Sequence, residues 1–452
     1  MSVWYDTSVF YHMYPLGMTG APRDNHPSSA PDVCRFSQLE AWIPHIRSLN
    51  FNAIYIGPLF ESTSHGYDTR DYRKVDSRLG TNEDFRRFVS LCHRQGIRVV
   101  VDGVFNHTGR EFFAFQDIIR NKWDSPCKDW YRGVRFDGQS PFGDPFCYDA
   151  WQGHFELPCL NLRNPQVRDY LFRCVDFWVK EFEIDGIRLD CANVLDFGFM
   201  EELRQVTSRM KEDFWLMGEV IHGDYARWMG PQILHSVTNY ELHKSIYSGF
   251  NDHNFFEIAH NVRRLESIGR DLYTFVDNHD EDRIASKLTD PNHLAPVYIC
   301  LYTLPGVPSV YYGGEWAVQG RRTRTSDQEL RPAISPEQFD QLHCPLTDLI
   351  ARLGEIHLQE NAFCKGVYRE LYLTNRQYAY SRENENSLVV TALNNDPAPA
   401  SFSIPLPQGI TQALPLIGEK WKISTPSVPI AVENGRLNIT LPGNWGNIFK
   451  LL

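Results

Sequence analysis

Short apolar runs alternate with amphipathic segments of helical period along most of the chain. Helical spacing is clearest over residues 167–182, where apolar side chains recur at i, i+3, i+4 and i+7. Alternating strands and helices predict a parallel sheet, because each helix returns the chain to the same end of the sheet. Apolar runs typical of strands occupy residues 9–14, 52–56, 97–101, 184–189, 214–218, 235–239, 272–276 and 308–312. Eight such units over about 360 residues favour an α/β fold of the (β/α)8, or TIM barrel, type, with a last long helix near 337–360.

Two segments interrupt this rhythm. Residues 107–160, after the third strand, are rich in turn residues and aromatic side chains, and a connection of that length predicts a small inserted domain. Further along, period-two alternation such as that over residues 387–393, separated by turns rich in Pro and Asn, indicates an antiparallel β-sandwich. We therefore expect a catalytic barrel over 1–106 and 161–362, an inserted domain over 107–160, and a C-terminal β-sandwich domain over 363–452.

Composition narrows the range of partners. The 45 Lys and Arg residues against 56 Asp and Glu give a net charge of −11, which disfavours nucleic acid and anionic membranes. Apolar runs fall short of the ~20 residues that a membrane span requires, and the start of the chain lacks the pattern of a signal peptide. Ten cysteines without a CxxC pair argue against a zinc ribbon, and we expect free thiols in a cytoplasmic protein.

Acidic side chains gather where the predicted strands end. Asp102 ends the third strand, Asp190 the fourth, Glu219 the fifth and Asp280 the seventh. In a barrel these ends meet, so the sequence predicts one acidic cleft. Glycoside hydrolysis needs a carboxylate nucleophile and a protonated carboxylic acid, and crowding of carboxylates raises the pKa of at least one of them. Arg188 precedes Asp190 by two residues, so it points to the same side and would keep Asp190 ionised.

Each of these residues also has a structural explanation. Asp190 or Glu219 alone could cap a following helix, and His107 or His279 could be a core histidine with satisfied hydrogen bonds. Asp102 is interpreted as a buried structural group rather than a catalyst. The joint occurrence of the acids at successive strand ends is what favours the chemical interpretation.

The strand-end blocks resemble the short motifs of the α-amylase family of retaining glycosidases. These blocks are Asp102-Gly-Val-Phe-Asn-His107, Gly186-Ile-Arg-Leu-Asp-Cys-Ala-Asn193, Gly218-Glu-Val220 and Phe275-Val-Asp-Asn-His-Asp280, with Leu157-Pro-Cys-Leu-Asn161 closing the inserted segment. The resemblance implies that Asp190 is the nucleophile, Glu219 the general acid and base, and Asp280 the third catalytic carboxylate. It also implies a set of substrate-binding residues: His65, Tyr67, Phe105, His107, Arg188, His222 and His279.

Within the family, residues 190–193 and 157–161 resemble the neopullulanase and cyclomaltodextrinase branch. Ser64 stands where exo-acting α-glucosidases carry an Asp, and the first strand begins too early for that branch's N-terminal domain. The resemblance implies a retaining hydrolase of α-1,4 bonds in maltooligosaccharides or related glucans, with α-1,6 cleavage and transglycosylation left open. The alternatives are a 4-α-glucanotransferase, a trehalose-synthase-like isomerase, or a non-catalytic carbohydrate-binding scaffold.

No cofactor or catalytic metal is expected. Asn106 resembles a calcium ligand of secreted amylases, but the inserted segment lacks a clear spacing of oxygen ligands for Ca²⁺. A structural calcium ion is therefore left open, as is the oligomeric state.

Overall fold

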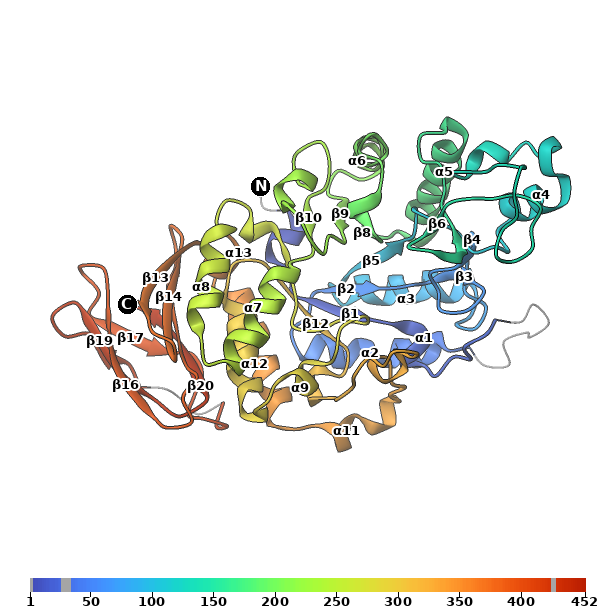
Figure 1. The fold of residues 1–452 in the computed structure, drawn as a ribbon. Helices are drawn as coiled ribbons and strands as arrows, with labels where there is room; N and C mark the ends of the chain where they lie inside the picture. Colours follow the sequence, from blue (N-terminus) through green and yellow to red (C-terminus); the bar gives the residue numbers. More distant parts are fainter. Residues whose placement is uncertain (1–2, 26–33, 424–427) are drawn as a thin grey trace.

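A computed structural model describes residues 3–25, 34–423 and 428–452 (Figure 1). Met1 and Ser2, which open the predicted leaderless N-terminus, lie outside the described residues. Eight parallel strands form one sheet: β1 (Phe10–Met13), β2 (Ala53–Ile56), β5 (Arg98–Gly103), β8 (Gly186–Leu189), β9 (Trp215–Gly218), β10 (Ser236–Val237), β11 (Tyr273–Thr274) and β12 (Val307–Tyr311). They lie side by side in chain order, and a parallel bridge between Thr238 and Tyr273 joins β10 to β11 and closes the barrel. The predicted TIM barrel is confirmed.

Successive side chains of each barrel strand point alternately into the barrel and toward the surrounding helices. Ala53 and Tyr55 of β2 belong to an inner apolar cluster, whereas Ile54 and Ile56 pack outward in the main hydrophobic core. Successive side chains of a strand point to opposite faces, so a continuous apolar run is what a doubly buried strand requires. The inner cluster comprises Phe10, Ala53, Tyr55, Val100, Trp215, Met217, Tyr240, Tyr273, Phe275 and Val307.

Helices surround the barrel (Figure 1). The longer ones are α2 (Phe36–Ser48), α3 (Asn82–Arg94), α5 (Pro165–Phe182), α6 (Phe197–Met210), α7 (Tyr240–Asn251), α8 (Phe255–Arg264), α10 (Leu294–Thr303) and α12 (Pro345–Gln359). Shorter ones are α1 (Pro15–Met18), α9 (Ile284–Lys287), α11 (Phe339–Leu342) and α13 (Ala362–Lys365). The α5 helix begins where the Asn164 side chain accepts from the Gln166 amide and Pro165 takes the first position.

The predicted helix near 337–360 is two helices rather than one. α11 ends at Leu342, and α12 begins only at Pro345. Proline lacks a backbone N–H and is tolerated in the first helical turn, so Pro345 marks a new start. The predicted strands at 235–239 and 272–276 are likewise shortened to β10 and β11, of two residues each.

Two additions to the barrel approach its carboxyl end. The hairpin of β3 (Phe60–Ser62) and β4 (Thr69–Val75) follows β2 and was not predicted. Within 107–160 the structure contains α4 (Phe113–Asn121) and a second hairpin, β6 (Ala150–Trp151) with β7 (His154–Pro158). An antiparallel bridge between His107 and Cys159 ties this inserted segment to the end of β5.

The C-terminal part is antiparallel, as predicted. A six-stranded sheet has the order β13-β14-β15-β20-β17-β18, and β16 pairs with β19 separately. The bounds are β13 (Val367–Leu373), β14 (Gln377–Glu383), β15 (Leu388–Asn394), β16 (Ala400–Pro405), β17 (Gln412–Pro415), β18 (Ile430–Ala431), β19 (Arg436–Leu441) and β20 (Trp445–Leu451). On β15, Val389 and Leu393 pack into the main core, whereas Val390 and Ala392 face the core of the C-terminal part. One face of this sheet therefore belongs to the barrel's core and the other to the sandwich.

In the described part of the chain, no helix combines the length and the apolar character needed to cross a membrane.

Candidate active site

The acidic side chains lie at the carboxyl ends of adjacent barrel strands. Asp190 directly follows β8 and Glu219 directly follows β9, and their backbone amides donate to the Gly103 and Leu189 carbonyls at 3.2 and 2.9 Å. Gly218, the last residue of β9, lets the Leu234 side chain pack closely against the strand, because a Cβ there would lie 2.5 Å from it. These strand ends open into a cleft of about 890 Å³, which Asp190, Glu219 and Asp280 line.

Arg188 is the centre of the buried charge network beneath the cleft. Its Nη1 lies 2.9 Å from Asp102 Oδ1 and 2.8 Å from Asp190 Oδ1, and its Nη2 lies 2.7 Å from Glu219 Oε1. One planar guanidinium therefore contacts three carboxylates, a geometry that a point-like ammonium cannot reproduce. The other oxygen of Asp102 accepts hydrogen bonds from Tyr55 and Tyr67 at 2.8 and 3.1 Å. Asp102 thus fixes the guanidinium from below.

The two carboxylates at the mouth of this network differ in environment. Asp190 and Glu219 each expose 6% of their surface, and one oxygen of each lies within 4.8 Å of the other and of the Cys191 thiol. Burial raises the pKa of Glu219; Arg188 opposes this, and the nearby Asp190 and Asp280 charges add to it. The Cys191 amide donates to Glu219 Oε2 at 3.0 Å. Glu219 is therefore suited to carry a proton near neutral pH.

Asp280 lines the same cleft and stays ionised. Burial raises its pKa, but His279, Arg331 and Arg188 lower it more, so the pKa lies well below its ordinary value. His279 Nε2 lies 3.1 Å from Asp280 Oδ2 and 2.6 Å from the Tyr67 hydroxyl, and the Tyr67 ring stacks on the imidazole. Arg331 Nη2 lies 3.0 Å from Asp280 Oδ1.

A family model described as alpha-amylase, catalytic domain, matches residues 39–345. The chain belongs to the α-amylase family. A cyclomaltodextrinase of Thermoanaerobacter pseudethanolicus is 28% identical over 417 residues, which cover 87% of this chain and 71% of the relative. An intracellular maltogenic amylase of Bacillus subtilis is 28% identical over 415 residues, 86% of this chain and 69% of the relative. The structure of a Nostoc punctiforme debranching enzyme superposes with a TM-score of 0.81 at 25% identity, covering 99% of this chain and 100% of that one.

The protein is accordingly a glycoside hydrolase of the α-amylase family. Of the residues singled out by sequence, those that line the cleft are His65, Tyr67, His107, Asp190, Glu219 and Asp280. Arg188 and His279 are 3% and 1% exposed and lie directly beneath it, in contact with cleft residues. His107 is also almost fully buried, and its Nε2 has no hydrogen-bond partner among the described residues. Burial lowers the pKa of His107 to about 4, so its imidazole is neutral.

Two predicted substrate-binding residues do not reach the cleft. Phe105 is fully buried in the hydrophobic core, where its ring stacks on Trp178 with centroids 5.8 Å apart, so its side chain cannot contact a sugar. His222 is exposed and lies outside the cleft lining, although its neighbour Ile221 belongs to it. The motif places both residues near the site in the chain, but the direction of each side chain depends on the backbone path after the strand.

Among the residues that line the cleft but were not singled out from the sequence are Trp151, Tyr240 and Arg331. Trp151 ends strand β6, and its ring lies 5.9 Å from that of His107. Tyr240 opens α7, and Arg331 follows the eighth strand, outside the family-like motifs. The aromatic character of Trp151 and its place in the inserted segment were visible in the sequence, but nothing marked it among the other aromatic residues there.

Asn106, the residue that resembles a calcium ligand, lies three residues after the end of β5. Its amide nitrogen lies 3.2 Å from His107 Nδ1, and the residue is 3% exposed. In the described ranges the one cluster of three His, Cys, Asp or Glu side chains with metal-ligand spacing is Asp190, Cys191 and Glu219. This cluster offers fewer oxygen ligands than the six to eight that Ca²⁺ takes. A structural calcium ion near Asn106 stays a prediction.

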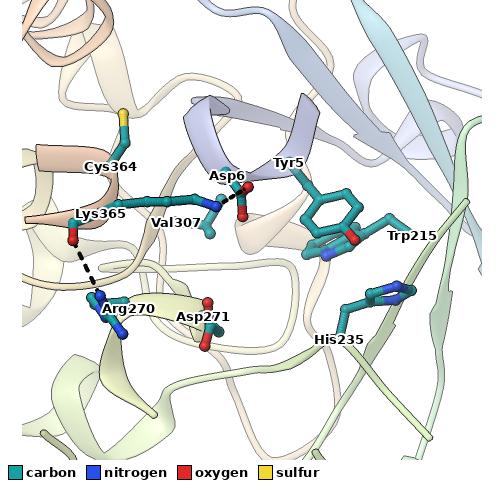
Figure 2. A pocket seen from close by; sticks show the side chains of 9 residues that line it. All are labelled: Tyr5, Asp6, Trp215, His235, Arg270, Asp271, Val307, Cys364 and Lys365. Atoms are coloured by element: carbon teal, nitrogen blue, oxygen red, sulfur yellow. Dashed lines mark hydrogen bonds and ion pairs between the residues drawn. The ribbon is translucent and has the colours of Figure 1, made fainter. Parts of the chain in front are cut away.

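A smaller cavity of about 120 Å³ lies at the other end of the barrel, where β9 and β12 begin (Figure 2). Figure 2 shows the Lys365 ammonium directed at Asp6, and Arg270 donating to the Lys365 carbonyl at 3.1 Å. Asp6, Lys365 and Arg270 are thus already engaged, and the amino ends of barrel strands are where stability rather than catalysis is usual.

Proposed function

We propose that this protein hydrolyses α-1,4-glucosidic bonds of maltooligosaccharides by double displacement with retention of anomeric configuration. The observation that carries the proposal is the separation of Asp190 and Glu219, whose nearest ligand oxygens lie within 4.8 Å. Retaining glycosidases place their two carboxyl groups about 5–5.5 Å apart, whereas inverting enzymes need about 6.5–9.5 Å to admit a water molecule. The spacing supports direct attack by a carboxylate.

In the first step Asp190 is the nucleophile. Arg188 Nη1 lies 2.8 Å from Asp190 Oδ1 and orients this carboxylate for attack. Glu219 gives its proton to the glycosidic oxygen as the bond to the anomeric carbon breaks, and Asp190 forms a new bond to that carbon. The leaving glucan departs as an alcohol, and the remaining sugar is held as a glycosyl ester of Asp190.

In the second step Glu219, now ionised, removes a proton from a water molecule that attacks the anomeric carbon. The Asp190 ester bond breaks, and the product sugar leaves with its original configuration. Asp280, ionised and held by Arg331, accepts hydrogen bonds from the hydroxyls of the distorted sugar. His107 supplies a neutral imidazole, and the Tyr67 ring stacks on the pyranose. An acceptor glucan in place of water would give transglycosylation.

The choice of substrate is supported by the relatives and by the size of the cleft. The relatives named above are a cyclomaltodextrinase and a maltogenic amylase, and the structural neighbour is a debranching enzyme. A cleft of about 890 Å³ is large for a single sugar and accommodates an oligosaccharide. We therefore include α-1,6 bonds of short branched glucans as secondary substrates.

We also propose a cytoplasmic location. Each of the ten cysteines, all within the described residues, is a free thiol. Free thiols are typical of reducing compartments, and the Bacillus subtilis relative is named as intracellular.

The test is turnover of maltotriose and maltoheptaose by Asp190→Asn and Glu219→Gln variants, with the anomer of the product followed by proton NMR. Both variants should fold normally and lose at least about 100-fold in kcat. Asp271→Asn, which changes a carboxylate at the opposite end of the barrel, is the matched control and should keep wild-type activity. Near-full activity of either cleft variant, or an inverted first product, would refute the proposal. Products longer than the substrate as the main outcome would make the protein a transferase.

A further inference from the structure

Tyr240 contacts the general acid from the side opposite the nucleophile's strand. It opens helix α7 and is 8% exposed, and its hydroxyl donates to Glu219 Oε1 at 3.4 Å. The Asn278 side-chain amide donates to the same hydroxyl at 3.0 Å. A phenol has one proton to donate, and Asn278 already approaches the oxygen as a donor, so that proton is left for Glu219.

Asn278 is held firmly enough to impose this direction. Its carbonyl oxygen accepts from the backbone amides of Asp280 and Glu281, both at 2.9 Å. These bonds decide which end of the Asn278 amide is the oxygen and therefore turn its NH2 group toward Tyr240. Burial raises the pKa of Tyr240, so the phenol keeps its proton throughout the neutral range.

The two oxygens of Glu219 are consequently unequal. Oε1 accepts hydrogen bonds from the Tyr240 hydroxyl and from Arg188 Nη2, the latter at 2.7 Å, so its two acceptor positions are filled. Among the residues that the structure describes, Oε2 accepts only from the Cys191 amide, at 3.0 Å. An acid proton on Glu219 is therefore placed on Oε2, where one acceptor position remains.

We propose that Tyr240, oriented by Asn278, is a positioning residue that fills Glu219 Oε1 and thereby confines the catalytic proton to Oε2. This rests on the proposed function, in which Glu219 protonates the leaving glucan. Without the phenol, the proton could occupy either oxygen, and only one of them faces the glycosidic bond. Loss of the phenol should therefore impair protonation of the leaving group while leaving nucleophilic attack by Asp190 intact.

The experiment compares two substrates in the full-length Tyr240→Phe variant. Maltotriose needs a proton on its leaving group, whereas α-maltosyl fluoride releases fluoride without one. We expect kcat/KM, which reports the first covalent step, to fall by about tenfold or more for maltotriose and to change less than about twofold for the fluoride. Asn278→Asp, which keeps the oxygen facing Asp280 but replaces the NH2 group that faces Tyr240, should show the same selective loss. Tyr247→Phe, on the same helix but half-buried and away from Glu219, is the control that should change neither value.

A pH profile gives a readout that a purely structural role would not move. The charged groups facing Glu219 are Arg188 and Asp190 from β8 and its end, and Asp280 from the loop after β11. These charged groups remain in Tyr240→Phe, but the hydroxyl that donates to the Glu219 carboxylate is lost. Loss of this donor raises the pKa of Glu219, so the basic limb of kcat/KM for maltotriose should move to higher pH.

The outcomes are separable. Equal losses on both substrates, or no loss on maltotriose, would overturn the role of Tyr240. A selective loss in Tyr240→Phe without one in Asn278→Asp would overturn the part assigned to Asn278. Failure of the wild-type enzyme to cleave either substrate would instead reject the proposed function.

Discussion

Replacing Arg188 by lysine tests how the buried cation sets the working pH range. Lysine keeps the positive charge but has a single ammonium group in place of the planar fork that contacts Asp102, Asp190 and Glu219. The contact that lysine is least able to keep is the separate one between Nη2 and Glu219 Oε1, at 2.7 Å. Its loss takes the cation out of direct contact with Glu219, a residue that is 6% exposed.

The size of the effect follows from that single contact. A hydrogen bond to a charged group contributes about 1.5–3 kcal/mol, and one pKa unit corresponds to about 1.36 kcal/mol. A cation in contact favours the ionised carboxylate, so loss of this contact raises the pKa of Glu219. Because Glu219 must be protonated to act as the proposed acid, the basic limb of the pH profile should move upward, by about one to two pH units if the whole contact energy is lost.

The assay is kcat/KM for maltotriose from about pH 4 to 10, with circular dichroism to establish folding at each pH. Arg173→Lys, a change in an exposed ion pair with Asp169 at 2.7 Å, is the matched control and should leave the profile unchanged. If folded Arg188→Lys keeps the wild-type basic limb, the contact between Arg188 and Glu219 does not hold down the pKa of the acid, and the reasoning fails.

Three further results are expected. Asp185→Asn should lower the free energy of unfolding in urea by about 3–5 kcal/mol, because the buried carboxylate accepts from His93, Arg98 and Lys211 at 2.6–2.8 Å. Burial raises the pKa of Asp185, but His93 and Lys211 lower it more, to well below its ordinary value. Its contribution is therefore complete above the unfolded pKa of about 4 and is lost as the pH falls, so an equal stability gap at pH 3 and pH 7 would contradict it. Trp151→Ala should lower kcat/KM for maltoheptaose by about 3–10-fold through loss of an aromatic surface in the cleft, and an unchanged value would remove this residue from substrate binding. Dialysis against EDTA should leave both Tm and activity unchanged, and recovery of lost activity by added Ca²⁺ would reveal a metal site.

The barrel could be predicted because its strands are buried on both faces. Runs such as Val99–Val101 are apolar throughout, and the helices between them have one apolar face. The strand ends then located the acids, since the topology of a parallel barrel brings all carboxyl ends together. Strands β10 and β11 are only two residues long, shorter than the apolar runs that predicted them. The length over which a strand pairs depends on the tertiary structure, which an apolar run in the sequence does not specify.

Side-chain direction was the part that sequence could not supply. Phe105 stands between strand-end residues of the same motif, but the chain has left the strand at Gly103 and the ring turns into the core. Tyr240 and Arg331 reach the acids from the sixth and eighth strand-to-helix connections, far from them in sequence. Such positions become visible only when the loops are placed in space.

The C-terminal sheet completes the outside of the barrel, and this limits how the enzyme can be shortened. Arg382 of β14 is fully buried and donates to the carbonyls of Thr303 and Phe363, at 3.1 and 2.9 Å, which belong to α10 and α13. Cutting the chain before β13 would strip these carbonyls of their donor and expose the apolar side of α10 that Val389 and Leu393 cover. An isolated barrel made in this way should aggregate, so engineered variants of the cleft need the whole chain as their scaffold.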